Sequence, residues 1–326
     1  MIRDSSIVAL GAVTDIHIFV SDLSKSIVSP GPRPITDDLV PAARELVGKA
    51  AAMKKPDFML SVGPIFFRGR RDSYAVDGEW LRFRKMPEEA PTLETLPSPM
   101  PRPMIAHLMS PLLRKGGLIY VVGSPGAGKT HTAAGTVVSR LCAYGGMAYT
   151  IEEPPEIPLN GWHGSGDIRG YCTQTWVAGE GETDWEEAFR TVLRSQPATL
   201  PAILYVGEVR DAKSAAALLR AAASGFLVIA TGFGNDIASG LDELIARASV
   251  NGDLKNTQYA IANVLRVALH QKLESGKLKP RMLVSANGRT PVATKIREGR
   301  TNGLEGDIQY QEIQLQKNIN LFDLGN

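Results

Sequence analysis

Residues 123–130 read Gly123-Ser124-Pro125-Gly126-Ala127-Gly128-Lys129-Thr130, which is the pattern G-x-x-x-x-G-K-[ST] of a phosphate-binding loop. An apolar, β-branched run over 118–122 precedes the pattern and predicts a strand, and small helix-compatible residues follow it. Glycines let backbone N–H groups crowd around phosphate oxygens, and the helix that follows begins with its positive dipole end toward the anion. The motif in these surroundings predicts a nucleoside triphosphate site.

The same loop indicates that the nucleoside triphosphate binds together with Mg²⁺. Lys129 is expected to reach the β- and γ-phosphates, and the Thr130 hydroxyl is expected to bind the metal ion. The motif and the histidine after it form the predicted nucleotide-binding set: Gly123, Ser124, Pro125, Gly126, Ala127, Gly128, Lys129, Thr130 and His131.

Two acidic segments complete the expected chemistry. The apolar run over 203–206 leads to Glu208, which is the Walker B arrangement, and this carboxylate is expected to order Mg²⁺ together with Thr130. The run over 148–151 leads to Glu152 and Glu153. A carboxylate at that strand end can orient and activate the attacking water, and we favour Glu152 over Glu153 for this role.

Arginines are the candidates for charge compensation. Arg82 and Arg84 alternate along an expected strand, so both guanidinium groups lie on one face of it. Such a pair can reach a phosphate across a domain or subunit boundary, although a solvated basic face explains the pattern equally well. Arg210, two residues after Glu208, is a further catalytic candidate near the nucleotide.

Proline at every second position marks a domain boundary at 97–103. Proline propagates neither a helix nor a central strand, so this segment is expected to be an extended linker. It separates a small α+β domain over 1–96 from a larger domain over 104–326. In the first domain we predict a helix over 39–53 and strands over 13–20, 58–60, 65–68, 73–76 and 80–84.

Strands and helices alternate in the larger domain, which is typical of a parallel α/β sheet with ligands at the carboxyl ends of its strands. The segment over 302–326 is left open between a strand, a helix and a docking tail. The predicted strands are 118–122, 148–151, 203–206 and 226–230, and the predicted helices are 185–195, 213–224, 240–248 and 259–273.

Composition narrows the class of protein further. A net charge of +2 and the lack of a recognisable DNA-binding module argue against a direct nucleic-acid partner. Two cysteines without metal-ligand spacing, Cys142 and Cys172, are expected to be reduced thiols of a cytoplasmic protein. No apolar stretch approaches the roughly 20 residues of a membrane span, so any membrane association is expected to come through partners.

Together these segments resemble the ATPases of the type II/type IV secretion and pilus superfamily, most of all pilus retraction motors and the transfer ATPases of type IVB secretion and conjugation systems. Residues 150–154, T-I-E-E-P, are similar to the family's T-I-E-D-P box, and residues 206–211, V-G-E-V-R-D, match its Walker B segment. Residues 80–96 look like its passage into the motor domain, and residues 291–299 resemble its C-terminal arginine-containing stretch. The resemblance covers roughly residues 57–298.

The resemblance implies a PAS-like first domain, a RecA-like P-loop NTPase domain and a ring of six identical chains. ATP would bind between the domains, with arginines completing the site. The protein would work in the cytoplasm, peripherally at the inner membrane, with inner-membrane and cytoplasmic components of a secretion, conjugation or pilus machine. The sequence does not choose between assembly, retraction and substrate transfer.

One departure from the family concerns its histidine-containing box, here Gly225 to Asn235. Phe226 and Phe233 stand where the family has histidines, and phenylalanine cannot donate a hydrogen bond to phosphate. Thr231 or Asn235 is then the residue expected to sense the γ-phosphate. The stretch 173–176, T-Q-T-W, lies where an arginine of the family is expected. Slow turnover is the expected consequence.

Three functions follow for comparison. The first is an ATP-hydrolysing hexameric motor, and the second is a weakly hydrolysing regulatory or assembly subunit of the same kind of machine. The third is a DNA translocase, which the near-neutral charge disfavours. The first is preferred because the lysine, the metal ligands and an activating carboxylate are all present.

Overall fold

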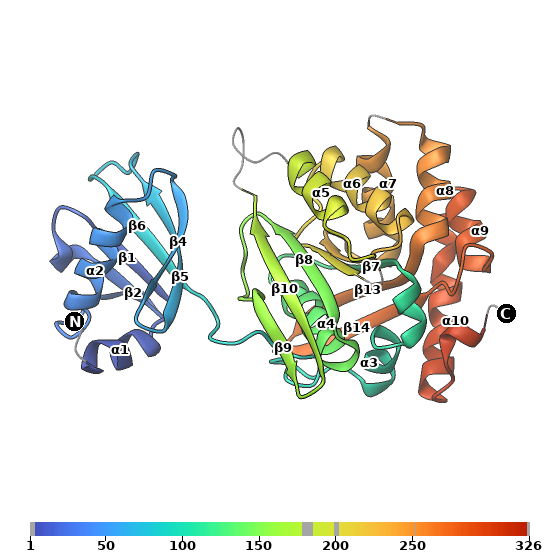
Figure 1. Cartoon of the computed structure of the whole chain (residues 1–326), viewed down its shortest axis with the longest axis horizontal. Helices are drawn as coiled ribbons and strands as arrows, with labels where there is room; N and C mark the ends of the chain where they lie inside the picture. Colours follow the sequence, from blue (N-terminus) through green and yellow to red (C-terminus); the bar gives the residue numbers. More distant parts are fainter. Residues whose placement is uncertain (1–3, 178–184, 199–201, 251, 325–326) are drawn as a thin grey trace. The chain divides into compact units, whose positions relative to one another are not determined.

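The computed structural model describes residues 4–177, 185–198, 202–250 and 252–324 (Figure 1). It divides into two compact units, Met1–Glu89 with Glu156–Pro158, and Ala90–Pro155 with Leu159–Asn326. The boundary between them along the chain lies at Glu89 and Ala90, N-terminal to the proline-rich segment expected to be the linker. Among the described residues, no helix is long and apolar enough to cross a bilayer.

The first unit is built on an antiparallel sheet in the order β3-β2-β1-β6-β5-β4. Its strands are β1 (Asp15–Phe19), β2 (Ile27–Ser29), β3 (Arg33–Pro34), β4 (Asp57–Val62), β5 (Ile65–Asp72) and β6 (Trp80–Lys85), and its helices are α1 (Asp4–Gly11), η1 (Leu23–Lys25) and α2 (Val40–Ala51).

Alternation along β6 separates the two faces of this sheet. Leu81 and Phe83 are buried in the core, whereas Arg82 and Arg84 lie on the opposite face. The predicted strand over 73–76 is wrong, because these residues form a turn-containing connection in which Tyr74 and Val76 are fully exposed. Apolar residues there find no neighbouring strand, so their β-propensity has no pairing to stabilise it.

The second unit holds the larger sheet, which in the described residues has the strand order β14-β13-β7-β12-β11-β8-β10-β9. β14 and β9 are antiparallel to their neighbours and the other strands run parallel. The strands are β7 (Gly117–Val122), β8 (Gly146–Glu152), β9 (Gly161–Ser165), β10 (Ile168–Trp176), β11 (Ala202–Val206), β12 (Leu227–Gly232), β13 (Leu265–Glu274) and β14 (Lys277–Val284).

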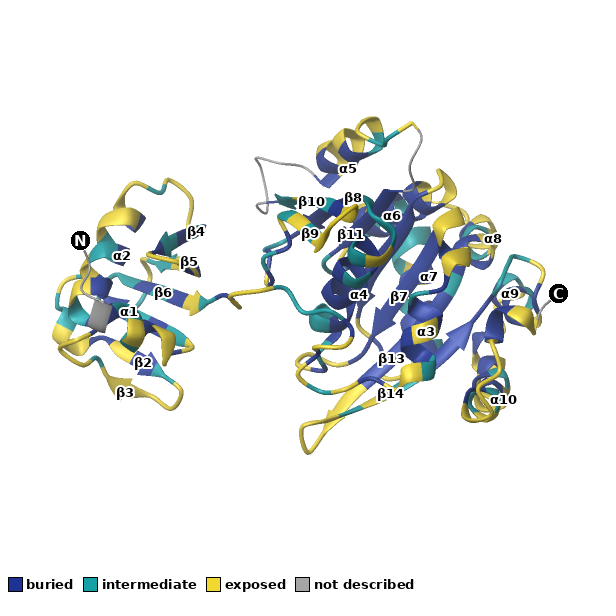
Figure 2. Ribbon diagram, turned by 60° about the horizontal axis from the view of Figure 1, so that its bottom comes forward, coloured by how far each residue is buried: buried dark blue, intermediate teal, exposed yellow. Residues whose placement is uncertain are grey.

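Helices cover both faces of this sheet (Figure 1). Every residue of β7, β11 and β12 is buried, which is what parallel strands require when both faces are covered (Figure 2). The predicted α/β class is thus confirmed. The helices are α3 (Arg102–Leu108), η2 (Pro111–Lys115), α4 (Lys129–Tyr144), α5 (Trp185–Arg194), α6 (Ala212–Ala223), α7 (Ile237–Ser249), α8 (Leu254–Val264), α9 (Pro291–Arg297), η3 (Thr301–Gly303), α10 (Leu304–Gln316) and η4 (Leu321–Asp323).

The predicted helix over 259–273 is wrong in its second half. α8 ends at Val264 and the chain continues directly as β13, which pairs with β7 on one side and β14 on the other. The buried run Leu265, Val267, Ala268 and Leu269 suits a central strand as well as a helix, and only these partners decide between the two. The hairpin β9–β10 was also absent from the sequence prediction.

The sequence left a strand, a helix and a docking tail as alternatives for residues 302–326. The structure has the helix α10 there, and α10 lies against β14. The buried Gln311 amide accepts a hydrogen bond from Val284 N at 2.7 Å and donates one to Val284 O at 2.9 Å. Arg281 of β14 forms ion pairs with Glu305 and Glu312 of the same helix. These contacts cover an edge strand that would otherwise expose unpaired backbone groups.

Residues 92–98, which include the start of the proline-rich segment, belong to the second unit and pack against its α4 and β14. Leu93 N donates to Ser139 Oγ of α4 at 2.8 Å, and Leu278 N of β14 donates to Ser98 Oγ at 2.8 Å. Gly135 permits the close approach, because a Cβ at that position would lie 3.2 Å from Thr92 C. Residues 92–98 therefore form a strap between α4 and β14.

His107 of α3 holds the end of the described chain. Its Nδ1 donates to Pro103 O at 2.6 Å, which leaves Nε2 to accept from Leu321 N at 2.8 Å, and its ring stacks on Phe322. Burial lowers the pKa of His107, partly opposed by a hydrogen bond to Pro103 O and by Asp323. The imidazole is therefore neutral, with one nitrogen donating and the other accepting.

We predict that protonation of His107 weakens the fold in mild acid. The unfolded chain takes up the proton near pH 6.5 and the folded chain only at lower pH, so this contribution to the free energy of unfolding is complete above about pH 6.5 and decreases as pH falls below it. In His107→Gln, which does not titrate, stability should fall less between about pH 7.5 and about pH 5.5 than in the unmodified protein, as measured by urea denaturation. His163→Gln, which alters a half-buried ring bonded to Leu159 O, is the matched control. An equal loss of stability in His107→Gln and the unmodified protein would contradict the prediction.

Candidate functional site

The predicted phosphate-binding loop is the connection between β7 and α4. Gly126 and Gly128 have φ values of +77° and +80°, in the left-handed region where a Cβ is strained. A Cβ at Gly123 would lie 2.3 Å from Gln271 O, so that position also requires glycine. Gly128 is the N-cap of α4 and provides no side-chain cap, which leaves the first backbone N–H groups of the helix directed at the loop.

Lys129 is held within this loop. The residue is 9% exposed, and its Nζ donates to Gly123 O at 2.9 Å and to Ser124 O at 3.0 Å. Thr130 and His131 follow on the first turn of α4, and both are half-buried. The ammonium and the uncapped N–H groups thus gather positive charge at one place, which is what an anionic phosphate chain requires.

Glu152 and the segment around Glu208 lie at neighbouring strand ends. The parallel register pairs Ile151 of β8 with Val206 of β11, which brings the residues that follow these two into proximity. Glu152, the last residue of β8, is 2% exposed, and a Cβ on Gly207 would lie 3.0 Å from its Cγ. Glu208 is half-buried and pairs with Arg210 Nε at 2.5 Å.

Gln174 is a site residue that the sequence analysis missed. It lies on β10 within the stretch where an arginine was expected, and its Nε2 donates to Glu152 Oε1 at 2.8 Å. Its Oε1 accepts from Leu159 N at 3.1 Å, which fixes the orientation of the amide. The Glu152 carboxylate is thus positioned by a neutral donor.

Gln271 of β13 is the second site residue that was missed. Its Nε2 donates to Ala127 O at 2.7 Å, and the side chain is completely buried. Its Oε1 has no hydrogen-bond partner among the described residues. No local motif indicates this role, and the spacing over 259–273 predicts a helix in place of β13.

Thr231 ties the Walker B segment to β12. Its hydroxyl donates to Gly207 O, and its own carbonyl accepts from Val209 N at 2.9 Å. Asn235, the other residue expected to sense phosphate, is exposed, and its backbone N–H donates to Ser239 Oγ.

The two phenylalanines of the altered histidine-containing box lie at opposite ends of β12. Phe233 follows the carboxyl end of β12, whose last residue Gly232 pairs with Val122 just before the phosphate-binding loop, and it is 46% exposed. Phe226 precedes the amino end of the same strand and is fully buried, with its ring against Tyr149. The expectation that both positions would face phosphate is therefore corrected for Phe226.

The remaining predicted arginines lie in the first unit. Arg82 pairs with Asp72 at 2.8 Å and contacts His17 Nδ1 at 3.3 Å, and Arg84 pairs with Asp15 at 2.8 Å. They share one face of the sheet, as their alternation predicted. Their participation in a nucleotide site stays a prediction.

Comparison with known proteins identifies relatives over most of the chain. A family model for type II/IV secretion system proteins matches residues 65–314. The chain is 30% identical over 234 residues to the uncharacterized protein YggR of Escherichia coli, a match that covers 70% of this chain and 65% of YggR. It is 29% identical over 168 residues to the type II secretion system protein HxcR of Pseudomonas aeruginosa, covering 52% of this chain and 33% of HxcR. The matches thus cover less than two thirds of these relatives.

Two solved structures share the fold. The pilus retraction motor PilT with bound ADP has a TM-score of 0.71 and 22% identity, covering 97% of this chain and 90% of that one. The ATPase DotB of Legionella pneumophila has a TM-score of 0.70 and 18% identity, covering 98% and 93%. The predicted RecA-like fold and the predicted superfamily are confirmed.

The environment of the two phenylalanines leads to a prediction. Phe226→His should lower the free energy of unfolding by about 2–4 kcal/mol, because it places a polar ring in an apolar core. Phe233→His at the exposed site should change it by less than about 0.5 kcal/mol. Urea denaturation of the two variants compares them directly. Equal effects would show that Phe226 is not the core residue described above.

Gln271 provides a second prediction. Gln271→Leu keeps the volume but leaves the buried Ala127 O without a donor, so the loop should lose its defined conformation and nucleotide affinity should fall about tenfold. Gln309→Leu, which changes a glutamine on α10 bonded to Glu305, is the matched control and should bind normally. The measurement is equilibrium binding of a fluorescent ADP analogue. Unchanged affinity in a folded Gln271→Leu protein would exclude a bracing role.

Proposed function

Since this chain belongs to the type II/IV secretion system protein family, we propose that it is an ATPase that drives a secretion or pilus machine. The single observation that supports this best is that three predicted site segments meet at the carboxyl ends of the parallel strands. The phosphate-binding loop after β7, the buried Glu152 at the end of β8 and Glu208 after β11 all lie at the carboxyl ends of parallel strands. In open α/β sheets, substrates bind at the carboxyl ends of the strands.

The residues present fit both cofactors. The loop offers uncapped N–H groups, two left-handed glycines and a lysine ammonium to a phosphate chain. The Thr130 hydroxyl and the Glu208 carboxylate are hard oxygen ligands of the kind that Mg²⁺ prefers. When bound, the metal ion would neutralise charge on the phosphates.

We assign the activating role to Glu152. It is buried beside Gly207 and receives a hydrogen bond from Gln174, so its position does not depend on solvent. A carboxylate held in this way can orient the attacking water and accept its proton. Glu153 is the weaker candidate, since its side chain is directed to α5, where its Oε2 accepts from Trp185 Nε1 at 3.1 Å.

Charge compensation in the transition state falls to arginines. Arg210 is available on the same loop as Glu208, and Arg82 and Arg84 are proposed to contribute from the first unit of a chain in a homohexameric ring. The ring is proposed to work in the cytoplasm, at the inner membrane through partner proteins, without direct contact to nucleic acid. Exchange of an ion-pair partner, from Glu208 or Asp72 to phosphate, would couple hydrolysis to movement.

A weakly hydrolysing regulatory or assembly subunit is the second candidate. The observation that favours it is Phe233, which lies exposed at the nucleotide edge where the family pattern has a hydrogen-bond donor. Hydrolysis would then depend on a partner or on mixed rings.

Steady-state phosphate release with Mg²⁺-ATP tests the proposal. Glu152→Gln and Glu208→Gln should each lower turnover by about 10²-fold or more, and Glu152→Gln should still bind ATP, because the amide removes only the proton acceptor. Glu153→Gln is the matched neighbouring control and should retain turnover.

The outcomes separate the candidates. Undiminished turnover in Glu152→Gln would reject this residue as the base. ATP binding without turnover above the Glu208→Gln background would reject the autonomous motor and favour the regulatory subunit.

A further inference from the structure

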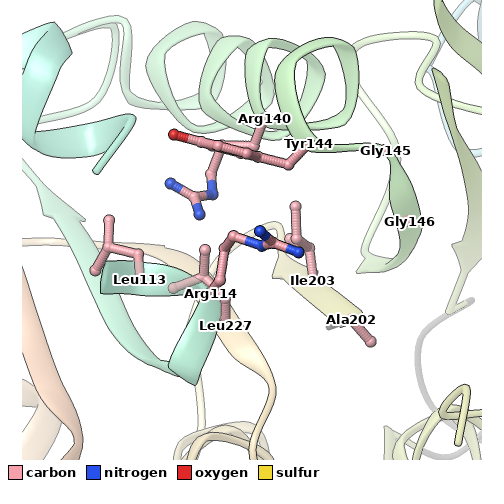
Figure 3. A pocket seen from close by; sticks show the side chains of 9 residues that line it. All are labelled: Leu113, Arg114, Arg140, Tyr144, Gly145, Gly146, Ala202, Ile203 and Leu227. Carbon is pink, nitrogen blue, oxygen red and sulfur yellow. The ribbon is translucent and has the colours of Figure 1, made fainter. Parts of the chain in front are cut away.

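A positively charged hollow lies at the amino ends of the parallel strands, opposite the phosphate-binding loop (Figure 3). It opens where β8, β11 and β12 begin, at Gly146, Ala202 and Leu227, and where α4 ends at Tyr144. α4 begins at Lys129, so the two sites lie at opposite ends of one helix. The hollow is therefore distinct from the proposed ATP site.

Two guanidinium groups face this hollow beside one aromatic ring. The Cζ atom of Arg140 lies 5.0 Å from the centre of the Tyr144 ring, and that of Arg114 lies 5.7 Å from it. Figure 3 shows both guanidinium groups on the same side of that ring. The Tyr144 hydroxyl donates to Met109 O, which fixes the orientation of the ring.

The positive charge of the pair is not balanced within the part of the chain that the structure describes. No Asp or Glu lines the hollow, and no carboxylate of the described residues forms an ion pair with Arg114 or Arg140. Burial lowers the pKa of Arg140 to about 10, and the charge of Arg114 contributes to the lowering. Two like charges at the same hollow repel each other unless an anion lies between them.

Arg140 also has donors to spare. The residue is 2% exposed, and its Nη1 donates to Leu108 O at 2.8 Å and to Ser110 O at 3.2 Å. A guanidinium has five N–H donors, so these two bonds leave Nε and Nη2 for a ligand. A purely structural role, closing the end of α3, accounts for Nη1 of Arg140 but does not account for Arg114.

We propose that this hollow binds the phosphate group of a small phosphorylated molecule. A phosphate ester carries a charge of about −1.5 to −2, which matches two guanidinium groups, and its oxygens accept from the planar arginine fork. Leu113, Ile203 and Leu227 line the same hollow and are buried, and its cavity volume of about 30 Å³ has room for the phosphate group itself, so the rest of the ligand would lie outside it. The proposal goes beyond the ATPase function and does not depend on it.

Calorimetric titration with inorganic phosphate tests the site in full-length Lys129→Ala protein, where the lysine of the other phosphate site is absent. We expect saturable binding in that background. Adding Arg114→Gln should weaken it about tenfold or more, because a charge-assisted hydrogen bond is lost. Arg114 is exposed, so its replacement should not disturb folding.

Matched controls separate a built site from general surface charge. Lys115→Gln changes the neighbouring exposed cation, which does not line the hollow, and should leave phosphate affinity unchanged. Equal weakening by Lys115→Gln, or no weakening by Arg114→Gln, would overturn the proposal. Acetate at matched ionic strength is the second ligand probe, and acetate binding as tight as phosphate would overturn it in favour of a protein carboxylate. Since Lys129→Ala is used throughout, failure here leaves the ATPase proposal untouched.

Discussion

The phosphate-binding loop depends on the passage of Gly123 against the backbone of β13. A side chain at Gly123 would collide with Gln271 O, and the Gln271 side chain in turn donates to Ala127 O. β7 thus delivers the chain to a turn that is fixed both by its own glycines and by the neighbouring strand. If β13 were a helix, as its apolar spacing allows, the loop would lose this support and Lys129 would lose a defined cradle. The position of β13 depends on β14, and β14 on the cover that α10 provides through Gln311 and Arg281.

The parallel register of β8 and β11 fixes the positions of the two carboxylates in the same way. β8 and β11 pair residue by residue up to Ile151 and Val206, so Glu152 lies against Gly207. Glu208 is the next residue after Gly207, which brings the two acidic residues to neighbouring strand ends. Thr231 then fastens this loop to β12, and Gln174 fastens Glu152 to β10. Four strand ends are thereby tied together through short polar contacts, and each contact needs its strand to end at the right residue. A buried network of this kind rigidifies a site when every member is satisfied.

Both ends of α4 gather positive charge. Its first turn presents N–H groups and Lys129 to the phosphate-binding loop, and near its last turn Arg140 lies beside Tyr144 and Arg114. The strap over 92–98 lies on the middle of this helix, where Gly135 allows it to come close. A single rigid helix therefore connects the proposed ATP site with the proposed phosphate hollow, and rigid elements of this kind can carry coupling between sites. The two phenylalanines of the altered histidine-containing box are divided between the same two ends of the strands. Phe226 is buried at the amino end of β12, on the side of the arginine hollow, and only Phe233 lies at the carboxyl end, on the side of the phosphate-binding loop.

The sequence alone determined the phosphate-binding loop, the acidic ends of two strands and the parallel α/β class. These features are readable because each depends on local chemistry: glycines that tolerate left-handed backbone, a lysine and a threonine at fixed spacing, and apolar runs followed by an acid. Only the tertiary structure decided that residues 265–274 form a strand, that Gln174 and Gln271 hold the site, and that Phe226 lies far along the strand from the loop. The unbalanced charge of Arg114 and Arg140 was equally invisible, since 26 positions of sequence separate them. The physical reason is that strand pairing and side-chain partners are set by which segments meet in space, and propensity and spacing along the chain do not carry that information.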